Sequence, residues 1–95
     1  MIGMSRTNSK LYFELGEQLP KQYPELNFDN HCYWRIALDN VLQGKWRDKI
    51  PAPAYKHLTD DQLDYVIHLL KSYSRDQRLL LQHNENSLRY RGKIK

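Results

Sequence analysis

The chain has 95 residues, of which 40% are hydrophobic and 12% aromatic, and its formal net charge is +4 at pH 7. This length supports one hydrophobic core and the aromatic content excludes a disordered chain, so we expect residues 1–95 to form a single domain. One cysteine excludes an intramolecular disulfide, and no apolar run approaches the roughly 20 residues of a membrane span.

The positive charge is concentrated near the C-terminus. Residues 1–70 hold eight Lys/Arg and nine Asp/Glu, a net charge of −1, whereas residues 71–95 hold seven and two, a net charge of +5. Nucleic-acid-binding domains more often spread their basic residues over one face. The pattern therefore predicts a basic C-terminal helix followed by a basic tail from about residue 89.

The first half of the chain predicts two helices. The first covers residues 9–19, capped by Ser9 or Asn8 and ended by Pro20, with Leu11, Tyr12, Leu15 and Leu19 on one face. Residues 20–28 connect it to a second helix over 31–43, which follows a cap at Asp29 or Asn30 and stops at Gly44. Apolar residues cover most of the circumference of this second helix, which predicts a central position.

The second half predicts an irregular connection and two more helices. Residues 45–58 contain Pro51 and Pro53, which prevent a continuous helix. A capping box at 59–62 then starts a third helix, and a second cap signal at 74–77 predicts a break near Tyr73 and a fourth helix from Arg75 to about Gly92. The buried stripe expected on the third helix is Leu63, Val66, Ile67, Leu70 and Tyr73, and the apolar residues of the fourth are Leu79, Leu80, Leu81 and Leu88. No β-strand pattern occurs, so the fold class is all-α, a small bundle of about four helices with one irregular Pro-containing connection.

A narrow polar strip on the second helix is the first candidate site. His31, Arg35 and Asp39 are spaced four residues apart, so they lie along one side of an otherwise apolar helix. In a binding site, Arg35 would hold an anion and His31 would act as an acid, a base or a ligand. The alternative is an intrahelical ion pair between Arg35 and Asp39 on a solvated strip.

No complete catalytic or metal-binding set is present in the sequence. Structural metal sites need paired ligand motifs, whereas this chain has one cysteine, Cys32, and no pair of histidines four residues apart. A lone cysteine on a helix is usually a small buried hydrophobic residue. We therefore expect no metal, no cofactor and no catalytic residue, and we favour a protein that is not an enzyme.

The C-terminal segment is a second candidate site, for nucleic acid. It consists of Arg89, Tyr90, Arg91, Lys93 and Lys95. Cations interleaved with an aromatic ring can hold phosphates while the ring stacks on a base. The alternative is a solvated tail, and no helix-turn-helix signature supports the nucleic-acid interpretation.

The interpretation that we favour is a small non-catalytic helical binding module. Tyr and Trp are abundant in this chain and are enriched at protein interfaces, so we expect a protein partner or self-association through the aromatic surface around the second helix. The alternative is a nucleic-acid-binding accessory protein that uses the basic C-terminal helix and tail. The N-terminus lacks the apolar segment of a secretory signal, so we expect a cytoplasmic location and no membrane contact.

Four segments of the chain, residues 4–8, 11–16, 28–33 and 87–91, resemble a small bacterial family of uncharacterised proteins. Members of that family are sometimes labelled as Gcn5-related acetyltransferases. The label implies an α/β fold with an acetyl-CoA loop of the form Arg/Gln-x-x-Gly-x-Gly/Ala. Residues 89–94 begin this pattern but end in Ile, and neither a preceding strand nor a following helix is predicted, so the residues themselves do not predict an acetyl-CoA site.

Overall fold

The computed structural model describes the backbone of residues 2–93 and the side chains of residues 9–93. This part of the chain contains no strand, and five α-helices and two 3-10 turns make up its secondary structure. They are α1 (Ile2–Gln22), η1 (Pro24–Leu26), α2 (Asn30–Leu42), α3 (Trp46–Lys49), η2 (Ala54–Lys56), α4 (Asp60–Arg75) and α5 (Gln77–Tyr90). The predicted all-α bundle is confirmed, and the short α3 and η2 lie within the predicted irregular connection.

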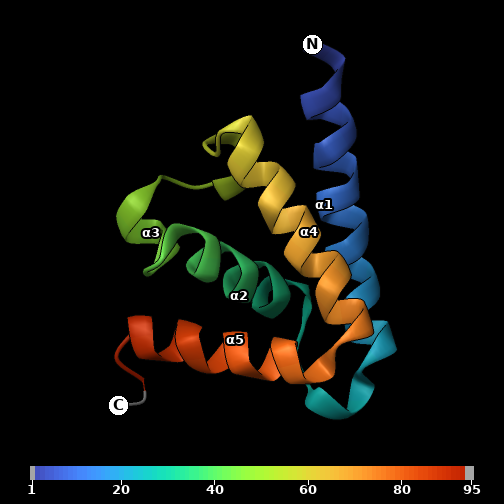
Figure 1. The fold of residues 1–95 in the computed structure, drawn as a ribbon, viewed down its shortest axis with the longest axis vertical. Coiled ribbons are helices and arrows are strands. Elements are labelled where there is room, and N and C mark those ends of the chain that lie inside the picture. Colours follow the sequence, from blue (N-terminus) through green and yellow to red (C-terminus); the bar gives the residue numbers. More distant parts are fainter. Residues whose placement is uncertain (1, 94–95) are drawn as a thin grey trace.

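The helices are arranged as two pairs that cross. Figure 1 shows α4 alongside α1 and α5 alongside α2, with the two members of each pair running in the same direction. Helix α2 also contacts α1, α3 and α4. The central position predicted for this helix is therefore confirmed.

Helix α1 is longer than predicted at both ends. It begins at Ile2, so Ser9 lies inside the helix and is not its N-cap, and Asn8, the alternative cap, belongs to the segment whose side chains are not described. The helix also continues through Pro20 for two more residues. Pro20 removes one helix hydrogen bond and its ring crowds the carbonyl four residues earlier, so the last turn of α1 needs other contacts to stabilise it.

Contacts with α4 stabilise the last turn of α1 beyond Pro20. The side-chain amide of Gln22 donates to the carbonyl of Ser74, and the hydroxyl of Tyr23 donates to the carbonyl of Tyr73 at 2.8 Å. The backbone N–H of Tyr23 still donates to the carbonyl of Leu19, at 3.1 Å. Tertiary contacts therefore outweigh the local preference that predicted an end before Pro20.

Helix α2 begins as predicted and ends one residue differently. Asp29 is its N-cap, and its carboxylate accepts a hydrogen bond from the backbone N–H of Cys32 at 3.0 Å. At the C-terminus, the left-handed residue is Gln43, with φ 55°, and not Gly44. The backbone N–H of Gly44 donates to the carbonyl of Asp39 at 3.1 Å and completes the turn.

The caps of α4 and α5 lie close to their predicted positions. The capping box of α4 is confirmed: the Thr59 hydroxyl accepts from the Gln62 N–H at 3.1 Å, and the Thr59 N–H donates to Oε1 of Gln62 at 2.9 Å. The break before α5 falls at Asp76, later than the predicted break near Tyr73. Asp76 caps α5 by accepting from the N–H of Leu79 at 3.1 Å.

The core lies where the predicted apolar faces of α1, α2 and α4 meet. All five residues of the stripe predicted for α4 are buried, as are Tyr12 and Leu19 of α1. Of the apolar residues of α5, Leu80 is buried, whereas Leu81 is 41% exposed. None of the helices in residues 2–93 combines the length and the apolar composition that crossing a bilayer requires.

Candidate functional site

The carboxylate of Asp39, in the C-terminal half of α2, is fully buried and accepts four hydrogen bonds within the described part of the chain. Its Oδ1 accepts from the backbone N–H of Trp46 at 2.9 Å and from Nη2 of Arg91 at 3.1 Å. Its Oδ2 accepts from Nε of Arg91 and from Oγ of Ser87, each at 2.6 Å. A buried charge is tolerated when it is paired and hydrogen-bonded in this way. Asp39 therefore ties α2 to the start of α3 and to the end of α5.

The structure separates the three residues of the predicted polar strip. Arg35 is half-buried and donates from Nη2 to Oδ1 of Asn84 in α5 at 2.8 Å. His31 is exposed at the start of α2. The interpretation of Arg35 and Asp39 as an ion pair on a solvated strip is wrong, because Asp39 is buried against α5 and is paired with Arg91 instead.

A cleft of about 720 Å³ lies over α2 and is partly open to solvent. His31 and Arg35 line it, whereas Asp39 lies outside its lining. The other lining residues come from α2 and its N-cap, from α1, from residues 45–47 and 52–55, and from Arg91. The cleft thus brings two residues of the predicted strip together with segments that are distant in sequence.

Aromatic rings form one part of the cleft. The indole of Trp34 stacks on the ring of Tyr12, with 5.3 Å between centroids and 6° between planes, and its N–H donates to the carbonyl of Tyr12 at 3.0 Å. Phe13 meets the edges of Trp34 and Tyr55, with centroids 5.6 and 4.8 Å away, and it remains 39% exposed. A Cβ atom on Gly16 would lie 2.1 Å from Nε1 of Trp34, so the indole packs directly against α1 because this residue is glycine.

Cations form the other part of the cleft. Arg35, Lys45 and Arg47 line it, and none of them forms an ion pair with a described carboxylate. The guanidinium of Arg47 lies over the ring of Trp46, with its central carbon 5.3 Å from the ring centroid. Asp29 is the one carboxylate among the described lining residues. The cleft therefore carries an excess of positive charge.

The protonation states in the cleft follow from burial and hydrogen bonding. The backbone N–H of Cys32 stabilises the carboxylate of Asp29 and lowers the pKa of Asp29. Burial raises the pKa of the Cys32 thiol, and burial also raises the pKa of the Tyr12 phenol well above its usual range. Cys32 is therefore held as a thiol, which is a poor nucleophile compared with a thiolate.

The residues of the predicted C-terminal site do not all lie in a free tail. Arg89 and Tyr90 belong to the last turn of α5 and are exposed, and Lys93 follows the helix and is exposed. Arg91 folds back onto α2, keeps 18% of its side chain exposed and lines the cleft. Lys95 lies outside the described residues. The basic segment therefore begins within α5, and one of its cations already has a partner.

The sequence did not predict that residues 45–47 line the cleft or that Ser87 donates a hydrogen bond to Asp39. The sequence did indicate that Asp39 would need a basic partner, because it is a carboxylate on an otherwise apolar helix. The C-terminal segment has a surplus of cations that could supply this partner. The sequence did not indicate which cation would be chosen. Nor did it indicate that the backbone of Trp46 would bind the same carboxylate.

The remaining features are the groups that could bind a metal and the loop pattern of the acetyltransferase resemblance. No three His, Cys, Asp or Glu side chains among them are placed to hold a metal ion. The loop pattern implied by the acetyltransferase resemblance begins in the last turn of α5 and passes through Gly92, which has φ +71°, but residue 94 lies outside the described part. That resemblance stays a prediction. Comparisons with protein-family models, with curated proteins and with solved structures found no match.

Proposed function

We propose that this chain is a small non-catalytic binding module that holds a negatively charged partner in the cleft over α2. The observation that carries the proposal is the charge of the cleft. Arg35, Lys45 and Arg47 are set against one lining carboxylate, Asp29, among the described residues. Clefts lined by one sign of charge concentrate ligands of the opposite sign and accelerate their association.

Two of these cations are held in place by neighbouring groups. Asn84 accepts a hydrogen bond from Arg35 without neutralising its charge, and the ring of Trp46 supports the guanidinium of Arg47. A side chain that is already positioned loses less conformational entropy when a ligand binds. This favours an anion-binding role over a merely solvated surface.

The rings of the cleft suit a partner that is not purely ionic. Phe13 and Tyr55 line the cleft next to the stacked rings of Tyr12 and Trp34. Aromatic residues are enriched at the cores of interfaces, where they bury a large area with few rotatable bonds. We therefore expect the partner to offer a flat or apolar group beside its negative charge.

A binding role is favoured over catalysis because two polar groups at or behind the cleft, the Asp39 carboxylate and the Cys32 thiol, are engaged or protonated. The lone pairs of Asp39 accept hydrogen bonds from Trp46, Ser87 and Arg91. Cys32 is held as a thiol because burial raises its pKa. An acidic segment of a protein, the partner type that the aromatic content favours, and a nucleic acid both meet the charge requirement.

Tryptophan fluorescence tests the proposal directly, because both tryptophans of the chain, Trp34 and Trp46, line the cleft. The protein is titrated at low salt with polyphosphate, polyglutamate, single-stranded oligonucleotides and acetyl-CoA. We expect at least one polyanion to change the emission, with an affinity that falls as salt is added. If none of these anions alters the emission, the cleft is not an anion-binding site.

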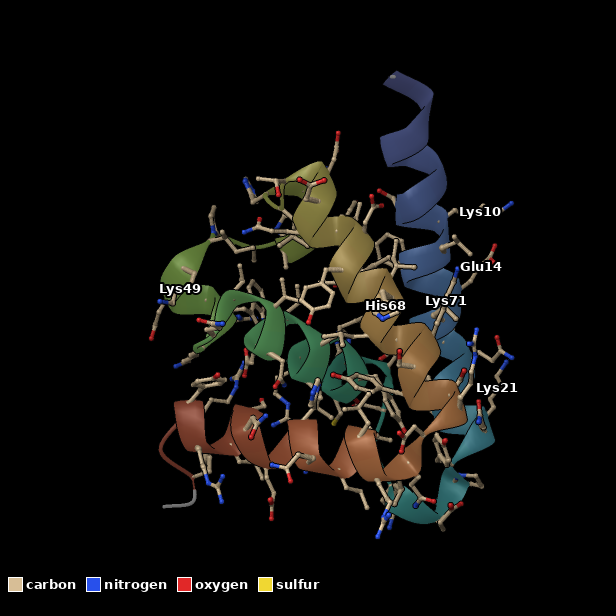
Figure 2. All side chains as sticks on the ribbon, in the orientation of Figure 1. Lys10, Glu14, Lys21, Lys49, His68 and Lys71 are labelled. Carbon is tan, nitrogen blue, oxygen red and sulfur yellow. The ribbon has the colours of Figure 1, made fainter. Side chains whose placement is uncertain are left out.

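A pair of charge-reversal variants gives the control. Lys45→Glu/Arg47→Glu reverses two exposed cations at the cleft, and Lys21→Glu/Lys71→Glu makes the same change in net charge elsewhere. In Figure 2, Lys21 and Lys71 lie on the α1–α4 side of the molecule, far from Lys49 at the end of α3. The first variant should lose binding and the second should keep most of it. Equal loss in the two variants would mean that net charge, and not this cleft, attracts the anion.

A further inference from the structure

Two basic segments, residues 45–49 and 89–93, lie about forty residues apart in sequence and meet at one carboxylate. The backbone N–H of Trp46 and the guanidinium of Arg91 both donate to Asp39, at 2.9 Å and at 2.6 to 3.1 Å. The start of α3 and the guanidinium of Arg91 therefore meet at Asp39. Figure 1 shows α3 and the C-terminal end of α5 on the same side of the molecule.

Together these segments form a surface with a strong excess of positive charge. Asp39 neutralises Arg91, but the other cations of the two segments are exposed and have no described carboxylate as an ion-pair partner. They are Lys45, Arg47, Lys49, Arg89 and Lys93. Asp48 is the one carboxylate within the two segments. The surface is continuous with the cleft, because Lys45, Arg47 and Arg91 line it.

Each segment places one aromatic ring between two cations. Trp46 lies between Lys45 and Arg47, and Tyr90 lies between Arg89 and Arg91. The ring of Trp46 lines the cleft, and Tyr90 is 43% exposed at the end of α5. Each of the two segments that meet at Asp39 therefore carries an aromatic residue between two basic residues in sequence.

We propose that this joined surface and the cleft bind single-stranded nucleic acid, an inference that rests on the proposed anion-binding function. A single strand repeats a phosphate and a flat base at every nucleotide, and it can offer both to a surface of alternating cations and rings. A duplex offers its phosphates but keeps its bases stacked on one another. An acidic peptide would satisfy the cations and leave the exposed ring of Tyr90 and the half-buried ring of Trp46 without a flat partner.

The experiment measures the fluorescence anisotropy of a labelled oligothymidylate of about ten nucleotides, a length within the ~4–16 nucleotides of single-stranded sites on OB folds. Competitors are the matching duplex, polyglutamate of equal charge, and thymidine monophosphate. With about four phosphates contacted, the affinity should fall about fiftyfold between about 50 and 200 mM salt. The single strand should compete best.

Three variants localise the site. Lys45→Glu/Arg47→Glu and Arg89→Glu/Lys93→Glu should each weaken binding at least about tenfold and reduce the salt dependence, because each removes phosphate contacts. Tyr90→Ala should weaken binding about tenfold with an unchanged salt dependence, because it removes stacking and no charge. Lys21→Glu/Lys71→Glu, with the same net charge as the first two variants, should bind nearly as the parent does. Circular dichroism confirms that each variant is folded.

The outcomes separate this inference from the proposed function. If polyglutamate binds and the oligonucleotide does not, the cleft is an anion site for an acidic protein segment and the nucleic-acid inference is wrong. Thymidine monophosphate that competes as well as the strand, or a duplex that binds more tightly, would also overturn it. If neither the oligonucleotide nor any other polyanion binds at low salt, both proposals are wrong.

Discussion

Arg91 donates two hydrogen bonds to the buried carboxylate of Asp39, from Nε at 2.6 Å and from Nη2 at 3.1 Å. The two residues are 52 positions apart in sequence, and their ion pair holds the end of α5 against α2. Asp39 is 0% exposed, so water does not stabilise its charge. The ion pair with Arg91 and the hydrogen bonds from Ser87 and Trp46 stabilise the charge instead.

Breaking this pair from the arginine side should strongly destabilise the protein. Arg91→Met leaves a buried carboxylate without its counter-charge, which costs about 3–5 kcal/mol, and we expect the lower end because the Arg91 side chain is 18% exposed. Urea denaturation measures the loss. The double variant Asp39→Asn/Arg91→Met should recover part of it, since no buried charge remains. Arg89→Met, two residues earlier and exposed, should have little effect, and a similar loss there would contradict the pairing of Arg91 with Asp39.

The contact between Gly16 and Trp34 predicts a second large effect. Gly16→Ala should lower the free energy of unfolding by about 1–3 kcal/mol, because the new methyl group meets the indole at 2.1 Å, although alanine favours helix by up to about 1 kcal/mol. Gly44→Ala is the control. There the added Cβ would meet Lys49 Cε at 2.8 Å, the end of a flexible exposed side chain that can move. Thermal denaturation of both variants is the measurement, and a Gly16→Ala protein that is more stable than the parent would refute the packing argument.

Two buried tyrosines should respond oppositely to loss of their hydroxyl groups. The hydroxyl of Tyr33 is buried without a hydrogen-bond partner among the described residues, and burial raises the pKa of Tyr33 to about 12. Tyr33→Phe should therefore leave stability unchanged or raise it by up to about 1 kcal/mol. The Tyr73 hydroxyl bonds to Nδ1 of His83 at 2.7 Å, so Tyr73→Phe should cost about 0.5–1.5 kcal/mol. Parallel urea titrations compare the two, and a larger cost for Tyr33→Phe would contradict the prediction.

His83 should make the stability depend on pH. Burial lowers the pKa of His83 below its usual 6.5, and Tyr73, whose pKa burial raises, remains protonated and is hydrogen-bonded to Nδ1 of the ring. The unfolded chain therefore binds more protons than the folded chain at pH values between the lowered pKa and 6.5. Stability should be fully retained above pH 6.5 and should fall as the pH drops through this window.

The measurement is the melting temperature of the parent protein and of His83→Gln across the range from neutral to mildly acidic pH. The glutamine variant should lose this part of the pH dependence, because it does not titrate. His57→Gln, at an exposed position after η2, serves as the control and should retain it. A His83→Gln protein with the same pH dependence as the parent would show that other groups are responsible.

Most of the fold follows from patterns that lie within single helices. The capping box at Thr59, the cap at Asp29 and the stripe from Leu63 to Tyr73 are each set by residues three or four positions apart, and each is confirmed. Such signals depend on backbone geometry that adjacent residues share, so they can be read without knowing the partner helices. The errors occurred where a distant contact decided the outcome, as at Pro20, where α4 stabilises the following turn of α1.

In the candidate site, too, some features follow from local patterns in the sequence and others depend on contacts between distant segments. The sequence alone shows that α2 is apolar around most of its circumference, that its polar residues are few, and that positive charge accumulates near the C-terminus. The packing of the helices places Asp39 away from the solvated strip, pairs it with Arg91 and brings the backbone N–H of Trp46 to the same carboxylate. A buried charge requires a partner, but its identity depends on which segments the packing of α2, α3 and α5 brings within hydrogen-bonding distance. The sequence therefore indicates that Asp39 needs a partner but does not identify Arg91. The pair of Asp39 with Arg91, together with the hydrogen bond from Trp46, joins the two basic segments into one surface.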